Sequence, residues 1–457
     1  MKAPSIAWFL DDGRARRQAA RRACPATRCL PTVLAAAAVG LAPAWWHLDL
    51  VDPGIDNITA VFGEVAIYPS DVCLAALAVL AIARPAPLCH QARWLAYGLT
   101  LLACVALFSA LPSTDPTLGA ALAGHLGLLA LAWLGVYAGR VSCTAVVVAL
   151  VVPAVAQSLL GVAQFGLQQP LVPSALHLPW LPSDVSEGGT PVVLGAAGDR
   201  LLRGFGTFPH PNILGGYLAL ALVCLPVLAN SWPRRWPVWW LVGAVLAAGL
   251  LASFSRAGWL AASVGLGAWW WSSHRRGHAR WRLLGVVPVT VAVIAISPLA
   301  PTIAPRLFPL GPDSNPLERG SVENRLALDR SALSEGFHHL PLGVGGGNYG
   351  LVALADGYQE GWGEPAPNLA LLIGAELGLP GIVAASLVVL GTIRAVRVSS
   401  GRDVAALAAC LAIAMLAMVD HYLWTMPLGR VIAWTPLALV AALGAANYPV
   451  SKNDSAP

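Results

Sequence analysis

The sequence predicts an all-α, polytopic integral membrane protein with about twelve transmembrane helices. Hydrophobic residues make up 57% of the 457 residues and charged residues only 11%, and the mean hydropathy is +0.67. That composition excludes a soluble globular protein. About twenty consecutive apolar residues span a bilayer as a helix, because only a helix satisfies its own backbone hydrogen bonds in lipid. Windows without any Asp, Glu, Lys or Arg lie between Arg28 and His47, Arg93 and Asp115, Arg235 and Arg256, and Arg430 and Lys452.

The apolar windows predict the helices in three groups, separated by two long polar segments at 165–211 and 302–367. Pro and Gly are frequent, with 36 and 45 residues. Membrane helices tolerate both, because neighbouring helices satisfy the backbone groups that such residues free. The predicted helices are 31–47, 65–83, 95–113, 118–138 and 142–164, then 212–230, 237–253, 257–272 and 283–301, and finally 368–391, 404–420 and 431–447.

The charged residues separate by sign, which predicts the orientation. Of the 28 basic residues, 20 lie before the first helix or in every second connection, whereas 19 of the 23 acids lie on the opposite side. Basic residues in short loops stay in the cytoplasm. We therefore expect a multi-pass protein of the cytoplasmic (inner) membrane with both termini inside, and any chemistry in the outer segments. The long basic region before the first helix favours a retained helix over a cleaved signal peptide.

Composition also excludes several function classes. The net charge of +5 is explained by the basic residues of the cytoplasmic connections. The sequence has no basic stripe interleaved with aromatic residues, the pattern that would indicate nucleic-acid binding. The eight cysteines fall in predicted helices or on the cytoplasmic side, so no disulfide framework is expected outside. No Asp-x-Asp occurs, and the glycines of 343–347 lack the Gly-Lys-Ser/Thr of a phosphate-binding loop. We expect no metal and no cofactor.

Polar motifs interrupt the apolar sequence at the predicted outer face. Arg203–Asn212 reads Arg-Gly-Phe-Gly-Thr-Phe-Pro-His-Pro-Asn and leads into a helix, and Ser253–Trp259 forms a turn between two helices. Asn324-Arg325 is followed by a Pro-Leu-Gly-Val-Gly-Gly-Gly-Asn run. The remaining motifs are Pro365–Asn368, Gly378–Gly381 and Asp420–Trp424, with Arg430 beyond them.

In this order, the motifs resemble the O-antigen ligase/polymerase family of envelope polysaccharide enzymes over roughly residues 200–430. The resemblance implies a helical, C-type glycosyltransferase architecture. It also implies a glycan donor carried on undecaprenyl diphosphate and a lipid-anchored sugar acceptor, either lipid A core or another carrier-linked repeat. The expected division is a basic tail at 1–30, N-terminal helices at 31–200, a catalytic membrane domain at 201–447 that includes 302–367, and a cytoplasmic tail at 448–457.

The resemblance implies roles for individual residues. Arg203 and Arg325 match the family's catalytic arginines, and permanently charged guanidiniums suit a departing diphosphate. Arg256 is expected to assist, although each of these arginines could instead be an interfacial side chain or a loop ion-pair partner. The other expected substrate-binding residues are His210, Asn212, Asn368, Asp420 and His421.

One position departs from the family. The ligases carry a histidine, the proposed general base, directly before the residue that matches Asn368, and here that position is Pro367. Proline cannot accept a proton. Either another group serves as the base, or the acceptor needs none, or this chain has lost ligase chemistry. Glu364, three residues upstream, is a candidate base, as are His210 and His421. We expect a partly buried Glu364 carboxylate to take the role, and the alternative is that Glu364 is a solvated loop acid.

Two other function classes stay open. A transporter or flippase for a lipid-linked sugar would carry more ionisable groups at mid-membrane than Asp71, His125 and Glu376 provide. His125 is interpreted as an interhelical hydrogen bonder. A catalytically inactive glycan-binding membrane protein is the third possibility, because of Pro367. The sequence does not distinguish ligase from polymerase, and it does not indicate the oligomeric state.

Overall fold

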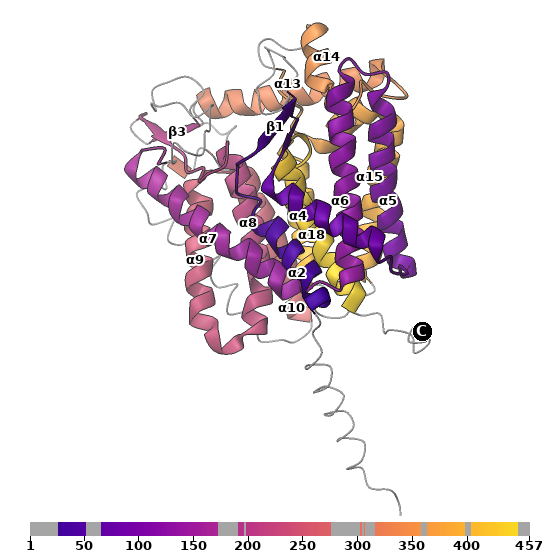
Figure 1. The fold of residues 1–457 in the computed structure, drawn as a ribbon. Coiled ribbons are helices and arrows are strands. Elements are labelled where there is room, and N and C mark those ends of the chain that lie inside the picture. The colour runs from indigo at the N-terminus through magenta and orange to yellow at the C-terminus, as the bar shows by residue number, and fades with distance from the viewer. Residues whose placement is uncertain are drawn as a thin grey trace, which may run out of the picture.

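The structure is a computed structural model that describes residues 26–51, 65–171, 191–195, 198–275, 302–303, 306, 316–357, 363–397 and 404–446. It is mostly helical (Figure 1). The helices are α2 (Ala26–Gly40), α4 (Pro69–Ala83), α5 (His90–Ala110), α6 (Pro116–Gly139), α7 (Cys143–Leu167), α8 (Pro211–Ser231), α9 (Trp236–Ala252), α10 (Arg256–Arg275), α13 (Pro316–His338), α14 (Tyr349–Ala355), α15 (Leu369–Arg397), α16 (Val404–Ala417), α17 (Tyr422–Thr425) and α18 (Pro427–Ala446). A 3-10 turn, Pro233–Arg235, joins α8 to α9.

Two small antiparallel strand pairs accompany the helices. Strand β1 (Leu48–Val51) pairs with β2 (Val65–Ile67), and β3 (Val192–Leu194) pairs with β4 (Arg200–Leu202). Two predicted helices, 31–47 and 65–83, extend into residues that are not helical in the structure. The first ends at Gly40, ahead of Pro43, and the second starts only at Pro69. Short apolar runs do not distinguish a strand from a helix end.

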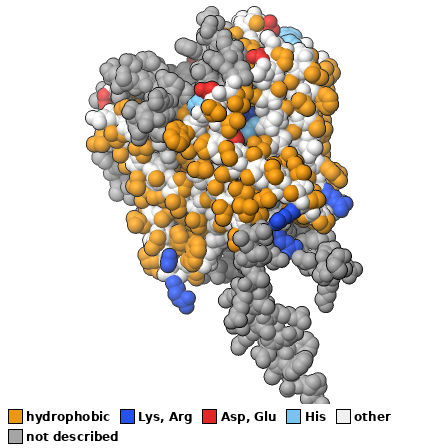
Figure 2. Space-filling view, viewed as in Figure 1, with side chains coloured by type: hydrophobic (Ala, Val, Ile, Leu, Met, Phe, Trp, Pro, Cys, Tyr) orange, Lys and Arg blue, Asp and Glu red, His pale blue; other side chains and the backbone are white. Residues whose placement is uncertain are grey.

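The chain is an integral membrane protein. Among the described helices, seven are long and apolar enough to cross a membrane, and three shorter apolar helices accompany them. Large apolar side chains such as Phe108, Val152 and Leu241 are at least 64% exposed, as expected for side chains that face lipid. Figure 2 shows a broad band of hydrophobic side chains across the visible face of the molecule. The predicted helix 283–301 lies outside the described residues.

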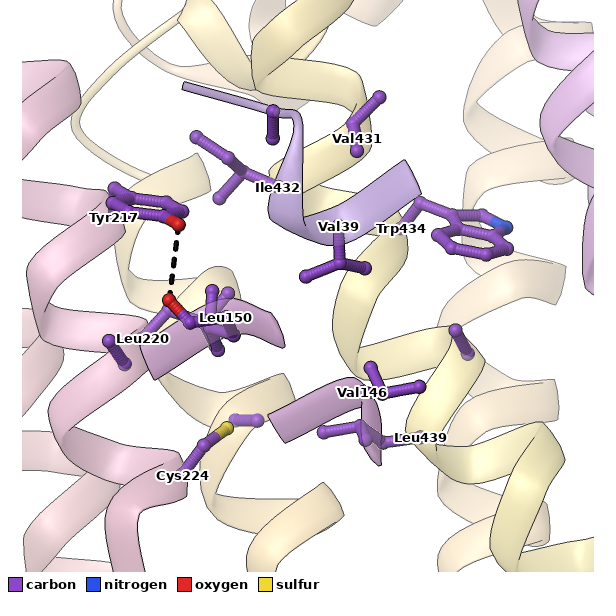
Figure 3. Packing of buried hydrophobic residues seen from close by; sticks show 14 of the residues in the cluster. Val39, Val146, Leu150, Tyr217, Leu220, Cys224, Val431, Ile432, Trp434 and Leu439 are labelled. Carbon is purple, nitrogen blue, oxygen red and sulfur yellow. Dashed lines mark hydrogen bonds between the residues drawn. The ribbon is translucent and has the colours of Figure 1, made fainter. Parts of the chain in front are cut away.

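The centre of the bundle is formed where α2, α7, α8 and α18 meet (Figure 3). Helices α8 and α18 are the most deeply buried of the candidate spans. The Tyr217 hydroxyl of α8 donates to the carbonyl oxygen of Leu150 at 3.1 Å, so its polar group is satisfied inside the core. Val39, Val431 and Trp434 are almost fully buried beside it.

The predicted outer loop 302–367 contains helices. Helix α13 is polar and lies across the upper end of the bundle, above α15, with α14 beside it (Figure 1). The 3-10 turn with Arg234 and Arg235 lies at the opposite, lower end, where α18 also ends. Figure 2 shows the same division, with Lys and Arg side chains at the lower end and acids and histidines toward the upper end.

Helix α15 is broken at Gly378, which has φ 61° and ψ −155°. The break frees backbone groups, and the glycine-rich segment after α13 satisfies them. The Val344 N–H donates to the carbonyl oxygen of Ala375 at 2.9 Å. The Leu379 N–H donates to the carbonyl oxygen of Pro341 at 2.9 Å. The Pro-Leu-Gly-Val-Gly motif thus supplies hydrogen-bond partners to the backbone of a broken membrane helix.

Replacing Gly378 with alanine should therefore destabilise the protein. Its φ and ψ lie in a region that is essentially restricted to glycine, and a Cβ would collide with the Pro341 carbonyl oxygen. Backbone strain alone costs about 1–3 kcal/mol. The measurement is thermal unfolding of purified protein in detergent. Gly127→Ala is the control, because a Cβ there meets nothing within 4 Å. Equal unfolding temperatures would contradict this account of the break.

Candidate functional site

Arg203 lies in the connection from β4 to α8, which the local sequence holds rigidly. The Gln164 side-chain oxygen of α7 accepts hydrogen bonds from the backbone N–H groups of Phe205 and Gly206, at 3.0 and 2.7 Å. Gly204 packs directly on the backbone of α7, where a Cβ would collide. His210 caps α8, since its Nδ1 accepts from the Asn212 N–H at 3.1 Å. The Arg-Gly-Phe-Gly-Thr motif therefore fixes its arginine in place.

The Arg203 side chain is buried, with 6% of its surface exposed. Its Nε donates to the Ser253 carbonyl oxygen at 2.9 Å, and its Nη2 donates to Asn212 Oδ1 at 2.8 Å. Asn212 Nδ2 in turn donates to Asp420 Oδ2 at 3.0 Å. Burial and the nearby arginines lower the pKa of Arg203, although a guanidinium stays protonated in proteins.

Arg325 reaches the same carboxylate from α13. Its Nη1 donates to the Val419 carbonyl oxygen, and its Nη2 lies 3.9 Å from Asp420 Oδ2. The side chain of Arg325 is 34% exposed, whereas that of Asp420 is 8% exposed. Asp420 thus connects Arg325 to Asn212, and through it to Arg203. Four residues that the sequence analysis selects therefore form one network.

Two further arginines meet at one buried acid. Glu318, in the first turn of α13, is fully buried. Its Oε1 lies 2.5 Å from Arg306 Nη1, and its Oε2 lies 3.4 Å from Arg256 Nη1. Arg306 Nε also donates to the carbonyl oxygen of Phe254 at 2.9 Å. Arg256 was predicted as an assisting residue, whereas Arg306 and Glu318 were not predicted.

We call Arg203, Arg256, Arg306 and Arg325 the arginine cluster. The positive charges of the other three members each lower the pKa of Arg203, so the four side chains lie close enough to interact electrostatically. Glu318 and Asp420 are the buried carboxylates that pair with the cluster. Four guanidiniums against two carboxylates leave a net charge of about +2. A surplus of positive charge on guanidiniums that are buried or partly buried is suited to an anion with two negative charges.

Residues 241–386 match the family model described as O-antigen ligase. The predicted resemblance to the O-antigen ligase/polymerase family is confirmed by this match. The matched residues run from α9 into α15 and include Arg256 and Arg325, whereas Arg203 and His210 precede them. No curated protein matches the chain.

The three candidate bases lie near Arg325. Glu364 Oε2 accepts from Asn324 Nδ2 at 3.1 Å, and Glu364 is exposed, so the expected partial burial is wrong. His421 Nδ1 lies 3.0 Å from Thr425 Oγ1. Burial lowers the pKa of His421, while Asp420 and Glu364 raise it, and the pKa of His210 is lowered by burial and by Arg203. Both histidines are therefore neutral near pH 7.

Asn368 caps the start of α15. Its Oδ1 accepts from the N–H groups of Ala370 and Leu371 at 3.0 and 3.3 Å, so this side chain already has a structural role. Its own N–H donates to Asp329 Oδ1 at 3.1 Å. Asp329 is thus a carboxylate beside the Pro367 position that the sequence analysis missed. It lies four residues after Arg325, a spacing that places both on one face of α13.

Replacing Arg306 with alanine should destabilise the protein. Fully buried Glu318 would lose its pairing with Arg306, and breaking a buried ion pair costs about 3–5 kcal/mol. Chemical unfolding in detergent measures this loss. Arg330→Ala is the control, because Arg330 is exposed on the same helix and should change stability by at most about 0.5 kcal/mol. A stable Arg306→Ala protein would refute the structural role.

Proposed function

We propose that this protein is a membrane glycan transferase of the O-antigen ligase/polymerase type. It moves a glycan from undecaprenyl diphosphate to a lipid-anchored sugar at the outer face of the cytoplasmic membrane. The observation that carries the proposal is the arginine cluster, whose surplus of about two positive charges matches a carrier diphosphate diester. The match to the O-antigen ligase model supports it independently.

The reaction is a displacement at the anomeric carbon of the donor glycan. The acceptor hydroxyl oxygen forms the new bond to that carbon, and the bond from the carbon to the diphosphate oxygen breaks. The electron pair leaves with the diphosphate, whose negative charge rises. Arg203 and Arg325 stabilise this developing charge from fixed positions. The acceptor proton passes to Glu364, which Asn324 holds next to Arg325.

Purified protein in detergent, supplied with cognate carrier-linked oligosaccharide, tests this function. Growth of the carrier-linked glycan identifies a polymerase, and transfer to lipid A core identifies a ligase. Absence of transfer with both acceptors would reject the transferase and favour a glycan-binding protein.

A lipid-linked glycan transporter is the second candidate, because ionisable groups lie inside helices. Asp71 Oδ1 of α4 is 3.1 Å from His125 Nε2 of α6, and Glu376 and Arg430 are buried nearby. Deleting the gene separates the two candidates. Loss of surface glycan length or attachment indicates the transferase, whereas cytoplasmic accumulation of carrier-linked glycan indicates the transporter.

The proposed orientation places both termini in the cytoplasm and α13 outside. Single cysteines introduced into a cysteine-free protein test it with a membrane-impermeant thiol reagent in intact cells. We expect labelling at Ser334→Cys, in α13, and none at Ser451→Cys, in the C-terminal tail. The reverse pattern would invert the topology and place the arginine cluster in the cytoplasm.

A further inference from the structure

A buried acid without a hydrogen-bond partner lies in the last turns of α13, away from the arginine cluster. Glu335 has 0% of its surface exposed. Within the part of the chain that the structure describes, neither of its carboxylate oxygens accepts a hydrogen bond. The nearest basic side-chain atom is His339 Nδ1, 3.3 Å from Oε2. A buried carboxylate in this state is costly unless a cation compensates it.

His339 is oriented in the way that metal-binding histidines are. Its Nδ1 lies 3.1 Å from the carbonyl oxygen of Glu335. A carbonyl oxygen can only accept, so Nδ1 carries the hydrogen and Nε2 of the neutral ring holds the lone pair. Metal-ligating histidines commonly donate their second ring N–H to such an oxygen.

A third group comes from the next helix. Asp356 ends α14, and the potential ligand atoms of Glu335, His339 and Asp356 all lie within 4.8 Å of one another. We propose that these three residues bind a divalent transition-metal ion, with Zn²⁺ as the best fit. Two carboxylates and one imidazole suit zinc, whereas Ca²⁺ and Mg²⁺ prefer oxygen ligands alone.

The site can close around the ion without moving its buried member. Zinc ligands lie about 2.0–2.2 Å from the metal, so the ligand atoms have to approach one another by about an ångström. His339 is partly exposed and Asp356 is exposed, which leaves both side chains room to turn inward. The buried Glu335 carboxylate stays in place while the other two side chains turn toward it.

The ion has a structural role. It joins the end of α13 to the end of α14, on either side of the glycine-rich segment that fills the break in α15. Arg325 lies ten residues before Glu335 on α13, about 15 Å along the helix. The ion therefore holds α13 in place and takes no part in glycan transfer, so its presence does not depend on the proposed function.

Tag-free, full-length protein in detergent, stripped with chelator, is titrated with ZnCl₂ and analysed for bound metal. We expect one zinc per chain and a higher unfolding temperature with zinc. Glu335→Gln and His339→Ala should each weaken binding at least about 100-fold, since losing a group that merely supports a ligand already costs about 10–100-fold. The matched control is His338→Ala, an exposed neighbour that should bind as the wild type does.

Asp356→Asn keeps the test decisive if the Glu335 variant does not fold, because Asp356 is exposed. It should also weaken zinc binding. Zinc bound at less than about a tenth of an equivalent would overturn the proposal, as would wild-type affinity in both the His339→Ala and Asp356→Asn proteins.

Discussion

Replacing Arg203 with alanine is expected to lower the rate of glycan transfer by about 10²–10³-fold, the usual cost of removing one preorganised donor to a developing negative charge. Arg203 is buried and held by Ser253 and Asn212, so it needs no reorganisation when the diphosphate departs. Arg203→Lys should recover little, because an ammonium group cannot reproduce the guanidinium's planar fork of donors. Single-turnover transfer by purified protein measures both variants.

Arg325→Ala separates chemistry from folding. About a third of the Arg325 side chain is exposed, and it links α13 to the Val419 carbonyl oxygen by one hydrogen bond. Its loss should therefore disturb the fold less than the loss of Arg203. We expect a similar fall in transfer rate with a nearly unchanged unfolding temperature. Arg330→Ala, on the exposed side of the same helix, should transfer at the wild-type rate. Full activity in both the Arg203→Ala and Arg325→Ala proteins would reject the leaving-group role.

The transmembrane helices were predictable because their ends carry local signals. Helix α6 begins after Asp115, whose side chain caps it, and ends at Gly139, close to the predicted 118–138. Helix α8 begins after His210, as the motif predicts. The strands β1 and β2 were not predictable, because their residues pair across a separation in the chain that apolar periodicity does not reveal.

The central part of the site was predictable, and its supporting part was not. Arg203, Asn212 and Asp420 each lie in a polar motif that is visible in the sequence, and the structure brings them together although Asn212 and Asp420 are 208 positions apart. Arg306 and Glu318 belong to no motif. Their pairing depends on how α13 packs over the bundle, which no spacing in the sequence encodes.

The proposed zinc site is likewise only partly visible in the sequence. Glu335 and His339 are four residues apart, so their position on one helical face is visible in the sequence. Asp356 joins them only because α14 turns back toward the end of α13. Tertiary packing thus completes sites whose first members a sequence can indicate.

The general base is where this chain departs most from the O-antigen ligases that it resembles, because Pro367 stands at the position of their histidine. Two carboxylates lie near that position in the structure. Asp329 accepts the Asn368 N–H, and burial raises the pKa of Asp329. Glu364 is exposed and accepts a hydrogen bond from Asn324, the residue next to Arg325. Its negative charge also raises the pKa of His421. We favour Glu364, since an acceptor from the outer face can reach an exposed carboxylate and Asp329 already binds backbone.

Glu364→Gln should therefore lower turnover by about 10²–10⁴-fold, the contribution of a positioned general base. The amide keeps the shape and can still accept from Asn324, so expression and unfolding temperature should not change. Asp329→Asn is the matched comparison and should retain most activity. Pro367→His in the Glu364→Gln protein should restore part of the rate, because an imidazole returns to the position where the family has its base. Unchanged turnover in Glu364→Gln, with a large loss in Asp329→Asn, would assign proton transfer to Asp329 instead.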